Sequence, residues 1–148
     1  MPAIDSELQA LRENLLDMLS MVRVQLQKCV EAIQERDPGI AMQVKEDEKK
    51  INIQELAIDR DCENILALHT PVATDLRLVI ATLKIANDLE RIGDSAKSLA
   101  KVISGDLTKK EYKWIESLGI VDMLSVLTDM LKEMGDAIRQ SDTKPALK

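Results

Sequence analysis

Aromatic residues are almost absent from this sequence, which has one tryptophan, one tyrosine and no phenylalanine. A core must therefore be filled by Leu, Ile, Val, Met and Ala, which suit packing between helices better than packing between sheets. Glycine and proline are also scarce, with five and four residues, and an all-β fold needs more turns than these could supply. The scarcity of both groups predicts an all-α protein.

Basic residues are outnumbered by acidic ones, 20 to 26, which leaves a formal net charge of −6. Phosphate backbones repel such a surface, so general binding of nucleic acid is not expected. Cysteine is limited to Cys29 and Cys62, too few for a disulfide framework, and each falls on an apolar stripe. These two residues are therefore expected to be buried thiols in a reducing compartment.

The sequence does not open with a basic-then-apolar leader, and it has no apolar run of the ~20 residues that a membrane span needs. We therefore expect a cytoplasmic protein that approaches a membrane only through its partners.

Apolar residues recur at helical spacing along most of the chain. Four long helices are expected, over about residues 6–36, 40–68, 71–104 and 108–140. Pro71 is expected to be the first residue of the third helix, and the fourth helix to be kinked near Gly119. The tail after residue 140 is polar and expected to fray. Because the first connections are short, the first three helices are predicted to form an antiparallel up-down-up bundle.

Each predicted helix carries an apolar stripe with steps of three, four or seven residues. The stripes comprise Leu15, Leu19, Val22, Leu26, Cys29 and Ile33; Val44, Ile51, Ile58 and Ile65; Ile85, Leu89, Ile92, Ala96, Leu99 and Ile103; and Leu118, Val121, Leu124, Leu127, Leu131, Met134 and Ile138. The stripe of the fourth helix has no further helix in the chain to pack against. This helix is therefore expected to dock on the bundle or on another subunit, with Trp114 as a core or interface anchor.

Acidic and amide residues accompany the stripe of the second predicted helix. Glu48 and Glu55 lie seven apart, and Asn52 and Asp59 follow each of them by four, so all four are expected at one edge of the buried face. If the turn is centred near Pro71, residues equally distant from it lie level on the second and third helices.

Glu90 and Asp94 of the third helix then meet the acidic edge of the second, with Asp94 facing Glu48 and Glu90 facing Asn52. They lie beside Gly93, and a glycine inside a helix costs about 1 kcal/mol of stability relative to Ala. Close approach of another backbone or of a ligand would explain a glycine there. Converging carboxylates repel one another, so they either hold protons or recruit a cation. Their oxygens suit magnesium, manganese, calcium or iron, and zinc less well. The alternative is a solvated edge with ordinary charges.

Two further classes of function stay open at this point. A carboxylate-bridged metal enzyme is disfavoured, because the sequence contains no Glu-x-x-His motif and no visible nucleophile–base pair. A helical oligomerisation module without a metal fits the same stripes.

Three segments carry a resemblance to a known family. TPVATDLRLVI (residues 70–80) and DLERIGDSA (88–96) resemble the signature of the PhoU family of phosphate-uptake regulators. NIQELAID (52–59) resembles the second helix of that family, and the similarity extends over residues 8–106. ESLG (116–119) resembles the opening of the family's second repeat.

The resemblance implies a repeated architecture and a metal-binding regulatory role. Residues 1–106 would form one three-helix repeat, and residues 107–148 would be the first helix of an incomplete second repeat with a polar tail. The implied function is a regulatory adaptor of phosphate uptake and phosphate-starvation signalling, which contacts the ATPase of the phosphate ABC transporter and a sensor histidine kinase. A homodimer is also expected.

The implied cofactor is a divalent or trivalent ion, namely iron, manganese, magnesium or zinc. Glu90 and Asp94 match the family's third-helix ligand pair, and Glu48 matches the first ligand of the second helix. Asn52 stands where the family has a second acid, and an amide is a weaker ligand. Glu55 and Asp59 repeat the spacing one heptad on and could substitute, which completes the predicted metal-binding set. The family resemblance does not imply a catalytic residue.

Overall fold

The computed structural model describes residues 3–141, and this part of the chain forms helices and no strand. The helices are α1 (Ala3–Glu35), α2 (Pro38–His69), α3 (Ala73–Ile103), α4 (Lys109–Ser117) and α5 (Ile120–Gln140). The prediction of an all-α protein is confirmed. The predicted frayed tail lies, from residue 142 on, outside the described residues.

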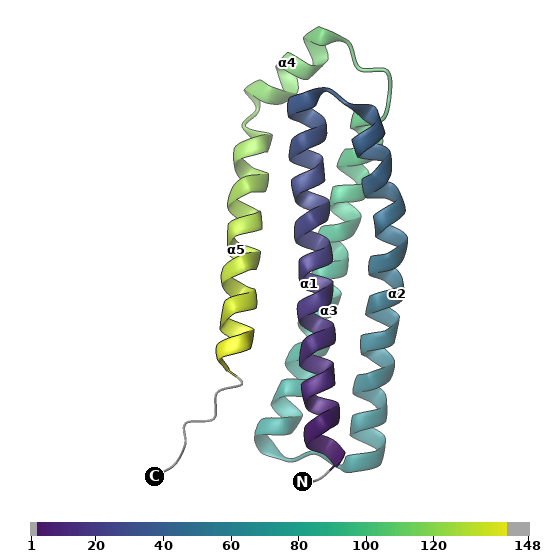
Figure 1. The fold of residues 1–148 in the computed structure, drawn as a ribbon, viewed down its shortest axis with the longest axis vertical. Helices are drawn as coiled ribbons and strands as arrows, with labels where there is room; N and C mark the ends of the chain where they lie inside the picture. Colours follow the sequence, from purple (N-terminus) through teal and green to yellow (C-terminus); the bar gives the residue numbers. More distant parts are fainter. Residues whose placement is uncertain (1–2, 142–148) are drawn as a thin grey trace.

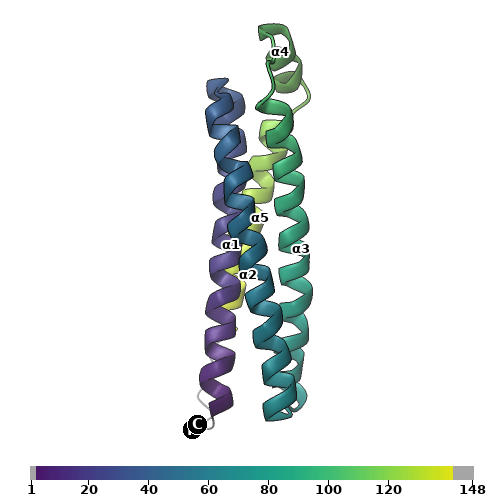
Figure 2. The ribbon, with the colours of Figure 1, turned by 90° about the vertical axis from the view of Figure 1, so that its right-hand side faces the viewer.

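Helices α1, α2 and α3 form the predicted up-down-up bundle (Figures 1 and 2). The antiparallel register of α1 and α2 is visible where Asn14 Nδ2 donates a hydrogen bond to Asp61 Oδ2 over 3.2 Å. The register of α2 against α3 is marked by Cys62, whose Sγ lies 3.9 Å from the carbonyl oxygen of Val79. Cys62 and Val79 are nearly equidistant from Pro71, as the sequence argument requires.

Helices α2 and α3 begin in different ways after the two short connections of the bundle. Asp37 caps α2 by accepting a hydrogen bond from Gly39 N at 2.8 Å, and Pro38 is the first helical residue. The prediction that Pro71 starts the third helix is wrong. Thr70 is left-handed (φ 46°) and Val72 is extended (φ −113°), so the chain becomes helical only at Ala73.

The predicted stripes of the first two helices are buried, including both cysteines. Helix α3 is rotated from its predicted orientation: its buried residues are Val79, Thr82, Ala86, Leu89, Gly93, Ala96, Ala100 and Ile103. Ile85, Ile92 and Leu99 are only partly buried. Small residues on the buried line let the backbone of α3 lie close to its neighbours. This rotation brings Glu90 and Asp94 to the rim of the core.

The predicted fourth helix is divided in two. A capping box of Thr108 and Glu111 starts α4, in which each residue bonds to the backbone of the other. Gly119 is left-handed (φ 72°) and separates α4 from α5, which runs antiparallel to α1 and packs on it (Figure 1). Trp114 is 64% exposed, so it is not a core residue, and its prediction as an interface anchor stays a prediction.

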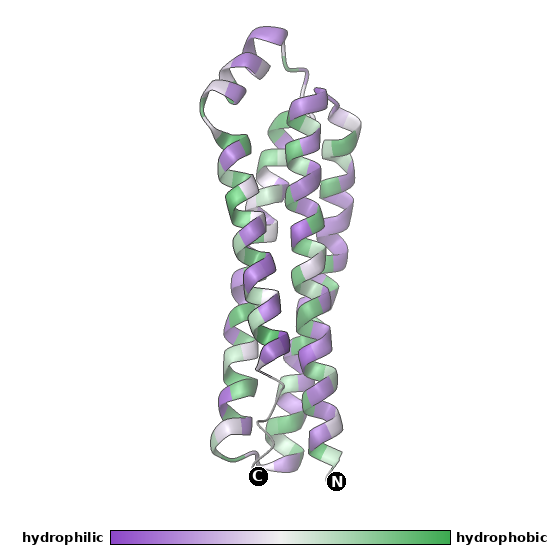
Figure 3. Cartoon of the chain, turned by 60° about the vertical axis from the view of Figure 1, so that its left-hand side comes forward, coloured by the Kyte–Doolittle hydropathy of each residue, from purple (hydrophilic) through white to green (hydrophobic). Residues whose placement is uncertain are grey.

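Polar and apolar residues are interspersed along the long helices (Figure 3). Across residues 3–141, no helix combines the length and the apolar character needed to cross a membrane.

Candidate metal centre

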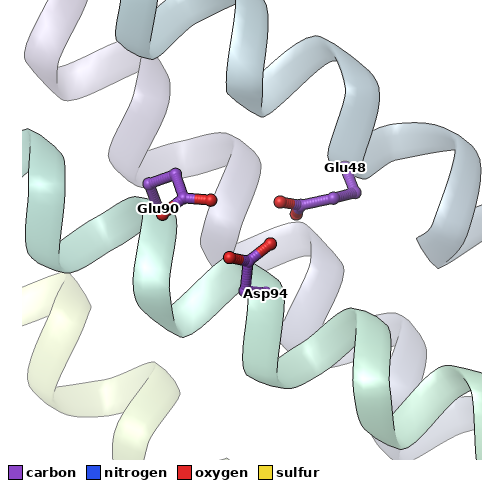
Figure 4. A group of neighbouring side chains, drawn as sticks. All are labelled: Glu48, Glu90 and Asp94. Atoms are coloured by element: carbon purple, nitrogen blue, oxygen red, sulfur yellow. The ribbon is translucent and has the colours of Figure 1, made fainter.

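Three carboxylates from two helices converge near the middle of the bundle. Glu48 comes from α2, and Glu90 and Asp94 come from successive turns of α3. One oxygen of each lies within 4.8 Å of the other two. Figure 4 shows the carboxylate of Glu48 directed toward the two α3 side chains. The predicted pairing of Glu48 with Asp94 across the two helices is confirmed by this arrangement.

Glu48 lies deeper than the sequence suggested. Its side chain was expected at the edge of the buried face, but the residue is only 1% exposed. Burial is the main reason that the pKa of Glu48 rises from its ordinary 4.5 to about 7, because a low-dielectric surrounding disfavours the charged form. A hydrogen bond from Gln25 opposes this rise in pKa, whereas contact with Asp94 and the charge of Glu90 add to it.

The pKa values of Glu90 and Glu55 are raised as well. Burial, followed by contact with Asp94 and the charges of Asp94 and Glu55, raises the pKa of Glu90 to about 6, while the nearby charge of Arg91 lowers it. The pKa of Glu55 is raised by burial first and then by the charges of Asp59 and Asp94. The cluster therefore accumulates more negative charge than its surroundings stabilise.

Gln25 of α1 also takes part in the site, and the sequence analysis missed it. The residue is fully buried, and its Nε2 donates to Glu48 Oε2 at 3.0 Å. A signal was present, since Gln25 lies seven residues from Met18 and from Ala32, two other buried residues of α1. A glutamine on such an apolar line must find polar partners within the core.

Gly93 allows α2 and α1 side chains to approach the backbone of α3. A β-carbon at this position would lie 2.8 Å from Glu48 Oε2 and 3.3 Å from Gln25 Oε1. Real β-carbons are essentially never found as close as the first of these distances. A close approach does occur at Gly93, but it is made by the side chains of Glu48 and Gln25 and not by the backbone or ligand that the sequence predicted.

The other predicted ligands are not part of this cluster. Asn52 is half-buried one turn along α2 from Glu48. The charge of Glu55 raises the pKa of Glu90, and the charge of Asp59 raises the pKa of Glu55. Among the carboxylates, thiols and imidazoles of the described residues, the group with metal-like spacing consists of Glu48, Glu90 and Asp94 alone.

Two buried oxygens without a hydrogen-bond partner indicate whether the site fits a cation. Within residues 3–141, neither Glu48 Oε1 nor Gln25 Oε1 has a hydrogen-bond partner. A buried acceptor without a partner costs about 1–3 kcal/mol, and more when it is charged. An oxygen-binding cation would offset the cost at Glu48 and the repulsion from the two α3 carboxylates. The residues therefore fit a hard cation such as magnesium, manganese or iron.

Comparison with known proteins shows similarity to the PhoU family and to several of its members. The model of the PhoU domain family matches residues 15–103. The chain is 32% identical over 144 residues to the phosphate-specific transport system accessory protein PhoU of Edwardsiella tarda, covering 97% of this chain and 58% of that protein. It is 44% identical over 97 residues to a homolog from Pseudomonas putida, covering 66% of this chain and 38% of that protein.

A homolog from Pseudomonas aeruginosa is 35% identical over 147 residues, covering 97% of this chain and 59% of that protein. The crystal structure of PhoU from Pseudomonas aeruginosa superposes with a TM-score of 0.82 at 34% identity, covering 93% of this chain and 66% of that chain. The chain thus spans less than two thirds of the length of these curated relatives.

Proposed function

The chain belongs to the PhoU family, whose model matches more than half of it, and we propose that it is a regulatory adaptor of phosphate uptake that binds a metal ion between α2 and α3. Relatives from Edwardsiella tarda and Pseudomonas aeruginosa are named for an accessory role in phosphate-specific transport. The proposed adaptor acts in the cytoplasm by contacting the ATPase of the phosphate ABC transporter and a sensor histidine kinase. It regulates these proteins without catalysing a reaction itself.

The observation that carries the metal site is the buried carboxylate of Glu48. One of its oxygens lacks a hydrogen-bond partner among the described residues, and two further carboxylates lie within 4.8 Å. Glu48, Glu90 and Asp94 would hold the ion through oxygen atoms. The bound cation would supply positive charge that cancels their repulsion and links α2 to α3.

Metal content tests this site directly. Glu90→Gln combined with Asp94→Asn keeps side-chain size and removes two negative charges, so the variant is expected to lose bound manganese or iron while keeping its helicity. The measurement is elemental analysis of protein purified without chelator and then dialysed against each metal. The matched control is Asp129→Asn with Glu133→Gln, an exposed acidic pair of the same spacing on α5, which should bind as much metal as the wild type.

The same proteins test the adaptor role. Metal-loaded wild type, immobilised, is expected to retain the purified transporter ATPase or the sensor kinase, and the α3 double variant to retain less of either. Equal metal content in all three proteins would reject the metal site. Retention of neither partner by loaded wild type would reject the adaptor function separately.

A metal-free oligomerisation module is a second candidate, favoured by the outer surface of α5. Met123, Val126 and Met130 lie on this helix and are 70%, 58% and 60% exposed. An apolar stripe of this kind is typical of a surface that packs against another helix. It also supports the proposal that the chain forms a homodimer.

A further inference from the structure

Gln25 reaches the carboxylate cluster from α1, the helix that contributes no acidic group to it. Its Nε2 lies 3.0 Å from Glu48 Oε2, 3.3 Å from the carbonyl oxygen of Gly93 and 3.4 Å from that of Val44. All three neighbours accept hydrogen bonds. The amide therefore has one favourable orientation, because turning it over would place Oε1 against three oxygens.

This orientation divides the two oxygens of Glu48 between two tasks. Oε2 accepts from Gln25 and is backed by Gly93, where even a β-carbon would lie too close. Oε1 lacks a hydrogen-bond partner in the described part of the chain, and the carboxylate points toward Glu90 and Asp94 (Figure 4). One oxygen is thus held by the core, and the other is left for a ligand.

We propose that Gln25 is a positioning residue that restricts Glu48 to one free oxygen and thereby sets which cation the cluster accepts. This inference rests on the proposed metal site. Calcium takes six to eight oxygen ligands and commonly uses both oxygens of a carboxylate, whereas magnesium and related smaller ions accept single oxygens. A carboxylate that cannot turn to offer both oxygens therefore disfavours calcium relative to manganese.

The test compares two metals in one variant. Gln25→Met has similar length and removes the donor, so Glu48 becomes free to turn. The dissociation constant for Mn²⁺ is expected to rise about tenfold, the effect typical of losing a residue that orients a metal ligand. The dissociation constant for Ca²⁺ is expected to stay unchanged or to fall. The ratio of the Ca²⁺ constant to the Mn²⁺ constant should therefore fall by about tenfold or more.

This ratio separates positioning from mere support of the fold. A general loss of structure would weaken binding of both ions together and leave the ratio unchanged. Thr82→Val is the matched control, since Thr82 is also buried, but its hydroxyl bonds within its own helix to Leu78 O. Isothermal titration of metal-free protein gives both constants, and infrared difference spectra of the carboxylate stretches report whether one or both oxygens bind.

Gly93→Ala provides a second route if the first variant does not fold. The added methyl group would displace Glu48 Oε2 from its place beside Gln25, so the same fall in the ratio is expected. Gly135→Ala is its control, because a β-carbon there makes an ordinary 3.4 Å contact with Leu19. If wild type binds Mn²⁺ but the ratio is unchanged in both test variants, the positioning role of Gln25 is overturned and the metal site is not. Wild type that binds neither ion would overturn the proposed metal site as well.

Discussion

Glu48 is a carboxylate in a place where glutamate is rarely found, since charged side chains are seldom fully buried unless paired. Gln25 donates a hydrogen bond to it, and the carboxylates that lie beside it in the cluster are acidic. Proton uptake and cation uptake are two ways to relieve the same excess of charge. The raised pKa of Glu48 and the metal affinity proposed for the cluster therefore have a common cause.

Stability without metal should depend on the protonation of Glu48. Its pKa is about 7 in the folded protein and near 4.5 when unfolded, so the folded state binds the proton more tightly. The stabilisation from this bound proton is complete below about pH 4.5, is lost as pH rises through 7, and amounts to about 3 kcal/mol. We expect urea unfolding in chelator to show wild type losing stability relative to Glu48→Gln between pH 5 and pH 8.

Adding Mn²⁺ at pH 8 should restore the stability that wild type has lost relative to Glu48→Gln, because the ion replaces the proton. A constant difference in unfolding free energy between wild type and Glu48→Gln across this range would show that Glu48 is not protonated within the fold.

At the scale of elements, the break between α4 and α5 determines what the end of the chain can reach. Gly119 adopts φ 72° in open space, with no atom within 4 Å of an added β-carbon. The left-handed conformation turns the chain so that α5 returns along α1 (Figure 1). A continuous helix would instead carry its apolar stripe away from the bundle.

Gly119→Ala should cost about 1–2 kcal/mol of unfolding free energy, because an L-residue is strained in the left-handed region and no steric clash contributes. The measurement is urea unfolding followed by circular dichroism. Gly135→Ala serves as the reference, since it lies inside α5 and gains helix propensity, and it should stay within about 1 kcal/mol of wild type. If Gly119→Ala were as stable as wild type, the left-handed turn would not be required for docking α5.

At the scale of the whole molecule, α5 is covered on one side only. Leu131 and Gly135 are buried against α1, while Met123, Val126 and Met130 remain exposed. Full burial of such a side chain contributes about 1.5–3 kcal/mol. Two chains that joined these surfaces would therefore gain enough to offset part of the entropy lost on association.

Met123→Lys with Met130→Lys is expected to convert a dimer into a monomer, measured by sedimentation equilibrium. The control pair, Met42→Lys with Ile53→Lys, changes apolar residues of similar exposure on α2 and should leave the dimer intact. A wild-type monomer, or dissociation by both pairs equally, would show that α5 is not the interface.

Local pattern determined much of this protein. The apolar stripes identify the long helices, and the short turn at Pro71 sets α2 against α3 so that Glu48 meets Asp94. The capping box at Thr108 likewise depends on residues three apart. These features follow from the sequence because helical periodicity and turn length are properties of neighbouring residues.

Tertiary packing decided the rest. The rotation of α3 depends on the small volumes of Ala86 and Gly93 against side chains of two other helices, so no single stripe could reveal it. That rotation places Gly93 against Glu48 of α2 and Gln25 of α1. The distribution of charge and hydrogen bonds around a buried carboxylate depends on residues distant in sequence, and only the folded bundle brings them together.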